Sequence, residues 1–426
     1  MMKKTIYQPL QETLYETELG TGLRLVILPK TGFVRKAATL LIPFGSVDGT
    51  VHLKNQPKTL IFPEGTAHFL EHMLFENGDN ISRQFALLGA SVNAYTTYNR
   101  TAVYFTTTNG VEAPLKLLFD MLTDATFKKE SLEKEKQIIL NEIAMYKDDV
   151  EQMMYYDLMN QMYTINTIRN DIAGSKESLE KIDQSVLQSA FDLFFQPKDM
   201  LLVLSGDIEM EKIIDLLTEH PFFRKVKPFI KKTSEKFLEK PEVAKAFIHK
   251  HLDLKSSLVM FGIKLERTKF YEPELSAIQE IKYQLFLDNY IGKSSPIQED
   301  MQKKKLINTT FDSSVSCEDS FAHVILFTET TRPAQTIAYL QKLLKNSANY
   351  QLDVDNFLKQ KRKLIGDFVQ IFDSVSRANA LLSDYFLRGI NVFQLIETID
   401  LLRPEDMEQV KQEISRSSIS VVHYSE

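Results

Sequence analysis

Apolar runs and amphipathic stretches alternate along the first half of the chain, and they predict a mixture of strands and helices. Residues 22–29 and 37–44 are short and largely apolar, as expected of two buried strands. Residues 102–108 and 200–206 have the same character, and the later run ends at a glycine. Between them, from about 115 to 162, the pattern is mainly helical, with lysine and glutamate on one side.

The second half of the chain repeats this order of elements. Strands are predicted near 246–252 and 257–265, followed by helices, a strand near 322–328, more helices and a last strand at 419–424. The repeat predicts an α+β protein made of two related α/β sandwich (roll) domains. Each would be a mostly antiparallel sheet with helices packed on one face.

A lysine-rich stretch with scattered prolines separates the two halves. Residues 221–242 have this composition, which is typical of a linker. We therefore expect an N-terminal domain over 1–220 that holds the chemistry described below, a linker over 221–242, and a related C-terminal domain without a metal over 243–426.

Composition narrows the class of protein. The chain has 426 residues, of which 43% are hydrophobic and 25% charged, an ordinary globular balance. A formal net charge of −6 gives no basic excess of the kind that recommends a nucleic-acid binder. The one cysteine, Cys317, excludes an intrachain disulfide. The disulfide-free chain predicts a reducing compartment, the cytoplasm, and no apolar run approaches the length of a membrane span.

Three residues with the chemistry of a metal site share one predicted helix. His68, Glu71 and His72 stand at positions i, i+3 and i+4, so a period of 3.6 residues brings them to one face. Two imidazoles one turn apart can bind one Zn²⁺, and a carboxylate beside them can reach a water on the metal. This is the H-x-x-E-H pattern of inverted zincins. The simpler alternative is a helix with two ordinary polar histidines.

A catalytic zinc usually keeps three protein ligands, so one more is needed. Glu135 and Glu142 are seven residues apart on the helix predicted over 131–149, and they therefore share a face. Glu142 also has apolar neighbours in the sequence. From the residues alone, a solvated helix acid remains the default interpretation of Glu142.

Several blocks of sequence together resemble the pitrilysin/insulinase family of zinc metallopeptidases. The strand end GSVDG (45–49) precedes the H-x-x-E-H helix, and GASVNAYTTYNRTAVYF (89–105) is similar to the family's G-x-x-x-N-A-x-T segment. The two-glutamate helix follows at the expected distance, and LVLSGDI (202–208) would close the first domain. The resemblance covers essentially the whole length, and it is greatest to the half-size bacterial, cytoplasmic members.

The resemblance implies a zinc-dependent endopeptidase for peptides or unfolded segments, with one Zn²⁺ per chain. His68 and His72 would bind the zinc, and Glu142 would be the third ligand. Glu71 would be the general base that takes a proton from water activated by the metal. Glu135 would act from outside the ligand set and hold a ligand or the zinc helix in place.

The same resemblance assigns Asn93 and Ala94 to an edge strand. A peptide substrate would add to this strand as a further β-strand, bound mainly through main-chain hydrogen bonds. A structural hairpin strand without a role in binding remains the alternative.

One part of the family pattern is missing. The family uses an arginine and a tyrosine, seven residues apart in a second-repeat domain, to hold the substrate carbonyl and stabilise the oxyanion. The corresponding stretch here, 299–317, contains neither residue. We therefore expect a heterodimer with a homologous subunit that lacks zinc ligands but carries the Arg/Tyr pair. A homodimer is the alternative.

Other signals and functions are weaker. His249 and His251 would share one strand face, a spacing that a metal could use, but no third ligand is evident and polar strand residues are the simpler interpretation. The main competing function is a non-catalytic scaffold or binding subunit of the same fold. Family members that have lost activity usually lack zinc ligands. This chain keeps all five residues with an expected role at the metal: His68, Glu71, His72, Glu135 and Glu142. A zinc hydrolase of small molecules has no distinguishing motif.

Overall fold

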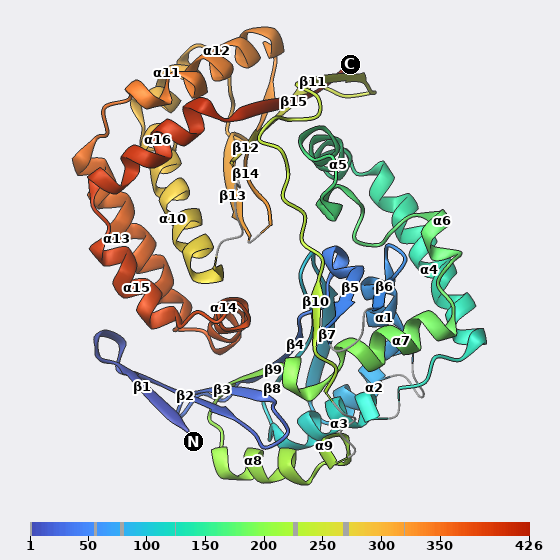
Figure 1. The fold of residues 1–426 in the computed structure, drawn as a ribbon. Coiled ribbons are helices and arrows are strands. Elements are labelled where there is room, and N and C mark those ends of the chain that lie inside the picture. The colour runs from blue at the N-terminus through green and yellow to red at the C-terminus, as the bar shows by residue number, and fades with distance from the viewer. Residues whose placement is uncertain are drawn as a thin grey trace. The chain divides into compact units, whose positions relative to one another are not determined.

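The chain forms two compact units, each assembled from three separate segments. The computed structural model, drawn in Figure 1, describes residues 2–54, 58–76, 81–123, 125–224, 229–266, 272–318 and 320–426. Unit 1 comprises Met1–Met145, Asn170–Glu235 and Val369–Val392, and unit 2 comprises Tyr146–Arg169, Lys236–Phe368 and Phe393–Glu426. The domain limits expected from the sequence stay a prediction, and residues 225–228 of the expected linker lie outside the described residues.

A seven-stranded sheet is the centre of unit 1. Its strands, in spatial order, are β1 (Lys3–Tyr7), β2 (Glu12–Glu18), β3 (Arg24–Pro29), β9 (Leu201–Gly206), β4 (Lys36–Ile42), β8 (Thr101–Thr107) and β7 (Ala90–Thr96). Neighbouring strands are antiparallel except for the parallel pair β3 and β9. β7 is therefore the last strand on one side of this sheet. A smaller sheet joins β10 (Lys232–Ser234), β5 (Thr50–Leu53) and β6 (Lys58–Ile61).

Helices from the N-terminal part of the chain cover one face of the large sheet. They are α1 (Thr66–Phe75), α2 (Ile81–Leu87), α3 (Glu112–Thr123), α4 (Lys129–Asp148), α6 (Lys176–Leu179), α7 (Gln184–Phe194), α8 (Met210–Glu219) and α9 (Pro221–Arg224). Alternate strand residues such as Leu40, Val103 and Leu202 are fully buried on this face and form one core with the helices.

A helix from late in the chain covers the opposite face of the same sheet. α14 (Val375–Leu387) packs against β4 and β9. Its Asn379 is buried between the strands, where its amide donates to the Val203 carbonyl at 3.0 Å and its Oδ1 accepts from the Thr39 hydroxyl at 2.5 Å. Because both faces are covered, every residue of β9 is buried. This explains its continuous apolar run in the sequence.

Unit 2 contains a five-stranded sheet of the same kind. Its strand order is β11 (Phe247–His251), β15 (Ser418–Ser425), β12 (Ser257–Lys264), β14 (Ala322–Thr330) and β13 (Asp312–Cys317). β11 runs parallel to β15, and the other pairs are antiparallel. The helices are α5 (Val150–Met162), α10 (Pro273–Tyr290), α11 (Pro296–Lys303), α12 (Pro333–Lys345), α16 (Met407–Arg416) and, mainly in this unit, α13 (Val354–Ile371) and α15 (Val392–Leu401).

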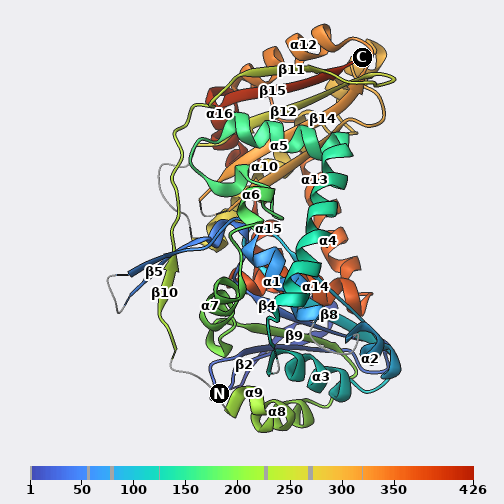
Figure 2. The ribbon, with the colours of Figure 1, turned by 90° about the vertical axis from the view of Figure 1, so that its right-hand side faces the viewer.

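α5 packs across β12 and β15, as Figure 2 shows. The Tyr424 hydroxyl donates to Asp157 at 2.6 Å, and the Lys264 ammonium donates to the Met162 carbonyl at 2.7 Å. A Cβ on Gly262 of β12 would lie 2.4 Å from the Met162 sulfur. Glycine at this position therefore lets the helix approach the strand closely.

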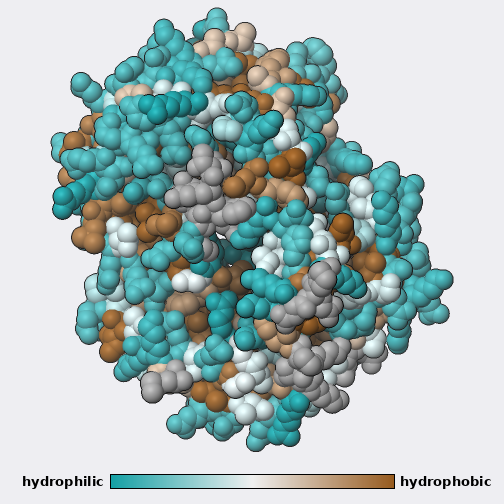
Figure 3. Space-filling view, viewed as in Figure 1, coloured by the Kyte–Doolittle hydropathy of each residue, from teal (hydrophilic) through white to brown (hydrophobic). Residues whose placement is uncertain are grey.

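The α+β fold with mostly antiparallel sheets is confirmed in both units. Each sheet carries its helices mainly on one face, and α14 and α5 add one helix to the other face. Within the described residues, no helix is long and apolar enough to cross a membrane. On the side drawn in Figure 3, hydrophilic residues predominate and apolar residues form small groups among them.

A buried histidine makes the stability of unit 2 depend on pH. His323 on β14 is 3% exposed, and its Nδ1 lies 2.9 Å from the Tyr163 hydroxyl. Burial lowers the pKa of His323 to about 4. The unfolded chain takes up this proton near pH 6.5, whereas the folded chain resists it down to about pH 4. Stability from this residue is therefore complete above pH 6.5 and is lost as the pH falls towards 4.

We expect His323→Phe to remove that pH dependence. Its size in the native protein is about 3 kcal/mol of unfolding free energy between pH 7.5 and 4. Denaturant unfolding at the two pH values measures the difference, and the substitution should reduce it by about that amount. His52→Phe, at an exposed position of β5, is the matched control. The same pH dependence in His323→Phe and the native protein would contradict the assignment.

Candidate metal centre

α1 carries the three residues of the H-x-x-E-H pattern on the side turned away from the core. Phe69 and Met73 are buried and hold the helix in unit 1. His68, Glu71 and His72 lie on the other side of the helix and are half-buried. The 3.6-residue period thus separates the anchoring residues from those with metal chemistry.

A glycine sets the start of this helix. Gly65 has φ of 86°, in the left-handed region, and a Cβ there would lie 2.4 Å from the Ala173 carbonyl oxygen. The Thr66 hydroxyl donates to the Pro63 carbonyl at 2.6 Å in the first turn. Because this close approach requires glycine, the backbone before α1 is held tightly against a second segment of unit 1. That contact fixes the position of the first turn of the helix that carries the two histidines.

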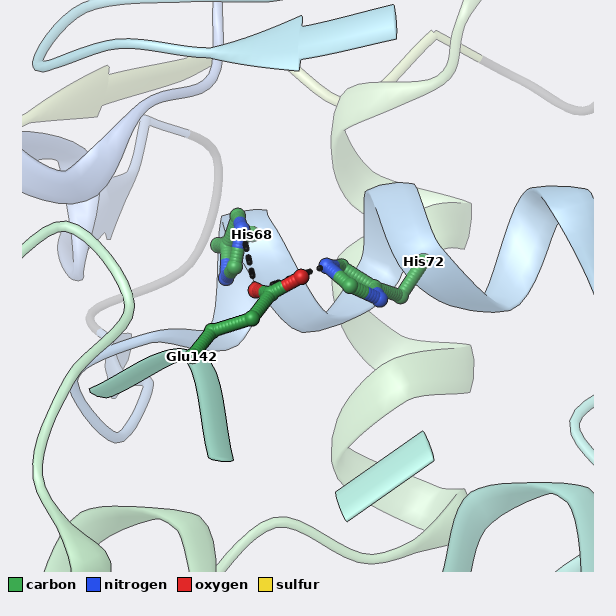
Figure 4. Close-up of side chains that lie close together, drawn as sticks. All are labelled: His68, His72 and Glu142. Carbon is green, nitrogen blue, oxygen red and sulfur yellow. Dashed lines mark ion pairs between the residues drawn. The ribbon is translucent and has the colours of Figure 1, made fainter. Parts of the chain in front are cut away.

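Glu142 of α4 meets both imidazoles of α1. Figure 4 shows its carboxyl group between His68 and His72. Glu142 Oε2 lies 3.4 Å from His72 Nε2 and 3.8 Å from His68 Nε2. One ligand atom from each of the three lies within 4.8 Å of the others, and in the part of the chain that the structure describes no other such group of histidine, cysteine or acid side chains is found.

These separations fit a single zinc ion. Ligand atoms at 2.0–2.1 Å from a tetrahedral ion are about 3.3 Å apart. The two contacts of Glu142, at 3.4 and 3.8 Å, are close to that value. Two imidazoles and one carboxylate are also the donor set of catalytic zinc sites that keep a fourth position for water or substrate. The three side chains therefore could hold a metal of this type.

The protonation state of His68 also suits a metal ligand. Burial, and then the neighbouring His72, lowers the pKa of His68 to about 3. The ring is therefore neutral at pH 7 and keeps the lone pair that a metal needs. Its Nε2 is the nitrogen that faces the Glu142 carboxylate, at 3.8 Å, and is therefore the atom in place to bind a metal.

Glu135 holds His72 from behind. Glu135 is 6% exposed and lies on the buried stripe of α4 that also contains Leu132 and Ile139. Its Oε2 is 3.0 Å from His72 Nδ1. A proton on Nδ1 donated to this carboxylate leaves Nε2, the nitrogen that faces Glu142, with the free lone pair.

Glu71 is held by a residue of the last sheet strand. The Thr96 hydroxyl on β7 donates to Glu71 Oε2 at 2.6 Å. Burial, and to a smaller extent Glu142, raises the pKa of Glu71, while Thr96 and His72 act in the opposite direction. No role of Thr96 was predicted from the sequence, where its place in the N-A-x-T segment is the only signal.

Asn93 and Ala94 lie on the same strand, before Thr96. The Asn93 side chain is exposed, and its Oδ1 accepts from the main-chain N–H of Ala94 at 2.8 Å. The structure thus brings the residues expected to bind metal, Glu71 and Glu135 into one group. Among the described residues, no hydrogen bond or ion pair joins Asn93 or Ala94 to that group. The stretch 299–317, without arginine or tyrosine, covers the end of α11 and β13 in unit 2.

We expect Glu135→Gln to weaken zinc binding without abolishing it. The amide oxygen can still accept from His72 Nδ1, but the negative charge that makes Nε2 more basic is lost. Changes to such outer partners typically cost 10–100-fold in metal affinity. Competition with a chromogenic chelator measures this constant. Glu133→Gln, at an exposed position of the same helix, should leave it unchanged. Equal affinities in the two variants would show that Glu135 does not support His72.

An H-x-x-E-H helix is the motif of inverted-zincin metallopeptidases. Residues 62–176 match the family described as Insulinase (Peptidase family M16). The chain is 30% identical over 420 residues to the uncharacterized zinc protease YmfH of Bacillus subtilis (strain 168), covering 97% of this chain and 96% of that protein. It is 23% identical over 410 residues to the zinc protease PqqE of Helicobacter pylori, covering 90% and 85%. The chain therefore belongs to the M16 (insulinase/pitrilysin) peptidase family, as the resemblance predicted.

Solved structures share the whole fold. The crystal structure of a protein described as an M16-like peptidase from Alicyclobacillus acidocaldarius matches with a TM-score of 0.90 at 24% identity, covering 100% of this chain and 98% of that one. A peptidase M16 inactive domain from Pseudomonas fluorescens matches with a TM-score of 0.77 at 15% identity, covering 96% and 97%. Because a domain described as inactive has this fold, the fold by itself does not show activity.

Proposed function

We propose that this protein is a zinc-dependent endopeptidase that cleaves peptides or unfolded segments. The observation that carries the proposal is the group formed by His68, His72 and Glu142, with the Glu71 carboxylate on the same helix. Membership of a peptidase family whose relatives are named zinc proteases supports it.

His68, His72 and Glu142 would hold one Zn²⁺. When bound, zinc supplies Lewis-acid chemistry that polarises a carbonyl and acidifies water. Glu135 would keep His72 in the tautomer that presents Nε2 to the ion, since its carboxylate lies against Nδ1. The low pKa of His68 keeps this ligand available at neutral pH.

Glu71 would act as the general base and acid. Its carboxylate would accept a proton from the attacking water and later give it to the leaving amine. Burial raises the pKa of Glu71, which brings the group closer to the range in which it can both take and return a proton. The Thr96 hydroxyl, 2.6 Å from one carboxylate oxygen, would hold Glu71 in a single orientation.

β7 would bind the substrate main chain. It is the last strand of the unit 1 sheet, and its Thr96 touches Glu71. A peptide paired with β7 near Asn93 and Ala94 would therefore run towards the proposed base. Recognition through main-chain hydrogen bonds makes little demand on the substrate's sequence, which suits unfolded segments.

A homologous partner subunit would complete the site. The stretch 299–317 lacks the arginine and tyrosine that the family uses to hold the substrate carbonyl. A partner without zinc ligands could supply that pair, and a homodimer is the alternative assembly. Peptide cleavage by the purified chain alone, at a rate that co-purified proteins from its native host do not increase, would remove the need for a partner. A cytoplasmic location stays a prediction.

Metal removal tests the function directly. The chain, with any partner that co-purifies, should bind one zinc per proposed site and cleave an unstructured peptide. Dialysis against a strong chelator should abolish cleavage, and zinc, but not Mg²⁺, should restore it. A protein that binds zinc but never cleaves peptides, even with its partner present, would favour the competing role of a non-catalytic binding subunit.

A further inference from the structure

Three of the chain's eight histidines meet at one edge of the unit 2 sheet. His249 and His251 lie on β11, and the parallel pairing of β11 with β15 sets His423 directly beside His249. The rings of His249 and His423 are stacked with their centroids 4.4 Å apart, and the centroids of His249 and His251 are 4.5 Å apart. A third imidazole, which the sequence did not associate with the pair on β11, thus comes from a strand more than 160 positions further along the chain.

The two exposed rings each have one nitrogen engaged by the end of β15. His249 Nε2 lies 2.8 Å from the Ser425 hydroxyl, and His251 Nδ1 lies 2.9 Å from the main-chain oxygen of Glu426. An imidazole with one nitrogen engaged in this way keeps its second nitrogen for an ion. Each ring therefore has one nitrogen in a suitable state for binding.

His423 is the buried member of the cluster. It is 9% exposed, and its Nε2 has no hydrogen-bond partner among the described residues. A buried nitrogen without a partner is costly for the protein.

We propose that His249, His251 and His423 form a second metal site, separate from the peptidase site, for a first-row transition ion such as Zn²⁺ or Ni²⁺. Imidazole is a preferred ligand of these ions. In the structure, no choice of one ring nitrogen from each of the three histidines places all three within 4.8 Å of one another. Binding would require His249 and His251, which are exposed, to rotate about their side-chain bonds and give up their present hydrogen bonds to meet an ion beside His423.

An ion bound to these histidines would stabilise the pairing of the edge strand β11 with β15. β11 is the last strand of its sheet, and on the α5 side Lys250 pairs with Asp157 at 2.5 Å. The histidines lie on the other face of β11, because side chains alternate along a strand. A metal shared by β11 and β15 would hold the edge strand from that face as well, in the way that bound ions stabilise folded segments.

Metal stoichiometry of the full chain tests the proposal without any assay of peptide cleavage. Equilibrium dialysis against Zn²⁺, and separately Ni²⁺, should give two equivalents for the native protein. His249→Gln with His251→Gln should leave one, because the affinity of the second equivalent falls more than about 100-fold. His68→Ala with His72→Ala should also leave one, and the combination of all four substitutions none. His52→Gln, at an exposed position of unit 1, should keep both.

The outcomes distinguish this site from the proposed peptidase site. One equivalent that is lost with His249 and His251 but not with His68 and His72 would support the strand site and contradict the peptidase site. Two equivalents in the His249/His251 variant, or one in the native protein that only His68 and His72 control, would overturn the strand site. As a second readout, Cu²⁺ bound to the His68/His72 variant should show imidazole nitrogen couplings in its electron paramagnetic resonance spectrum. Their absence would also overturn the proposal.

Discussion

Replacing Glu71 with glutamine is expected to leave zinc binding intact and to lower peptide cleavage roughly 10²–10⁴-fold, the usual contribution of a general base. Glutamine has the same shape and can still accept from the Thr96 hydroxyl, which lies 2.6 Å from the native carboxylate. It cannot take a proton from water. The measurement is kcat on an unstructured peptide, together with zinc content by elemental analysis of the same preparation.

Glu76→Gln is the matched control for this variant. Glu76 follows the last residue of α1 and pairs with Lys134 at 2.8 Å, so it tests the loss of one carboxylate at the end of the same helix. Its kcat should stay near the native value. Native kcat in a zinc-loaded Glu71→Gln protein would exclude Glu71 as the base, whereas loss of zinc in this variant would make Glu71 a ligand.

Replacing Glu142 with glutamine should remove both the metal and the activity. This carboxylate is the group that faces both imidazoles, at 3.4 and 3.8 Å, so the two histidines of α1 would be left as a two-ligand site. Removing a ligand should weaken zinc binding by more than the 10–100-fold seen for outer partners. We expect cleavage to fall with zinc occupancy and to return in part only at high zinc concentration.

The neighbouring residue gives the control for Glu142. Asn141 lies one position earlier on α4 and is exposed, so Asn141→Ala should bind zinc as tightly as the native chain. Competition with a chelator measures the zinc affinity of the two variants and of the native chain. If Glu142→Gln bound one zinc with native affinity, the third ligand would have to be another residue, and the proposed geometry of the centre would be wrong.

The residues of α1 show how much local sequence can predict. His68, Glu71 and His72 had to share a face because any α-helix has 3.6 residues per turn, and the helix itself followed from its apolar positions. The common face of Glu135 and Glu142 on α4 followed in the same way. Both carboxylates approach the His72 ring in the structure, which agrees with a common face.

The approach of Glu142 on α4 to the histidines of α1 could not be predicted from either helix alone. The pattern on α4 by itself favoured a solvated glutamate, and only the resemblance assigned Glu142 to the metal. In the structure the match is made by packing, since Leu132, Ile139 and Ile143 bury α4 in unit 1 and turn Glu142 towards α1. The roles of Asn93 and Ala94 stay predictions.

Two further contacts could not be predicted from the sequence, because each depends on how distant segments pack. Thr96 touches Glu71 because β7 and α1 pack together, and His423 stacks on His249 because β15 pairs in parallel with β11. Neither contact follows from a period or a motif. The segments that contribute α14 to unit 1 and α5 to unit 2 likewise lie far along the chain from the rest of each unit.

The sequence by itself determined the elements, their amphipathic faces, the α+β class and the kinds of side chain offered to a metal, because these depend on contacts between residues a few positions apart. Only the tertiary structure decided which faces meet. Glu142 with the imidazoles of α1, Thr96 with Glu71 and His423 with the β11 pair all depend on strand register and helix packing, which are set by the burial of apolar surface over the whole of each unit.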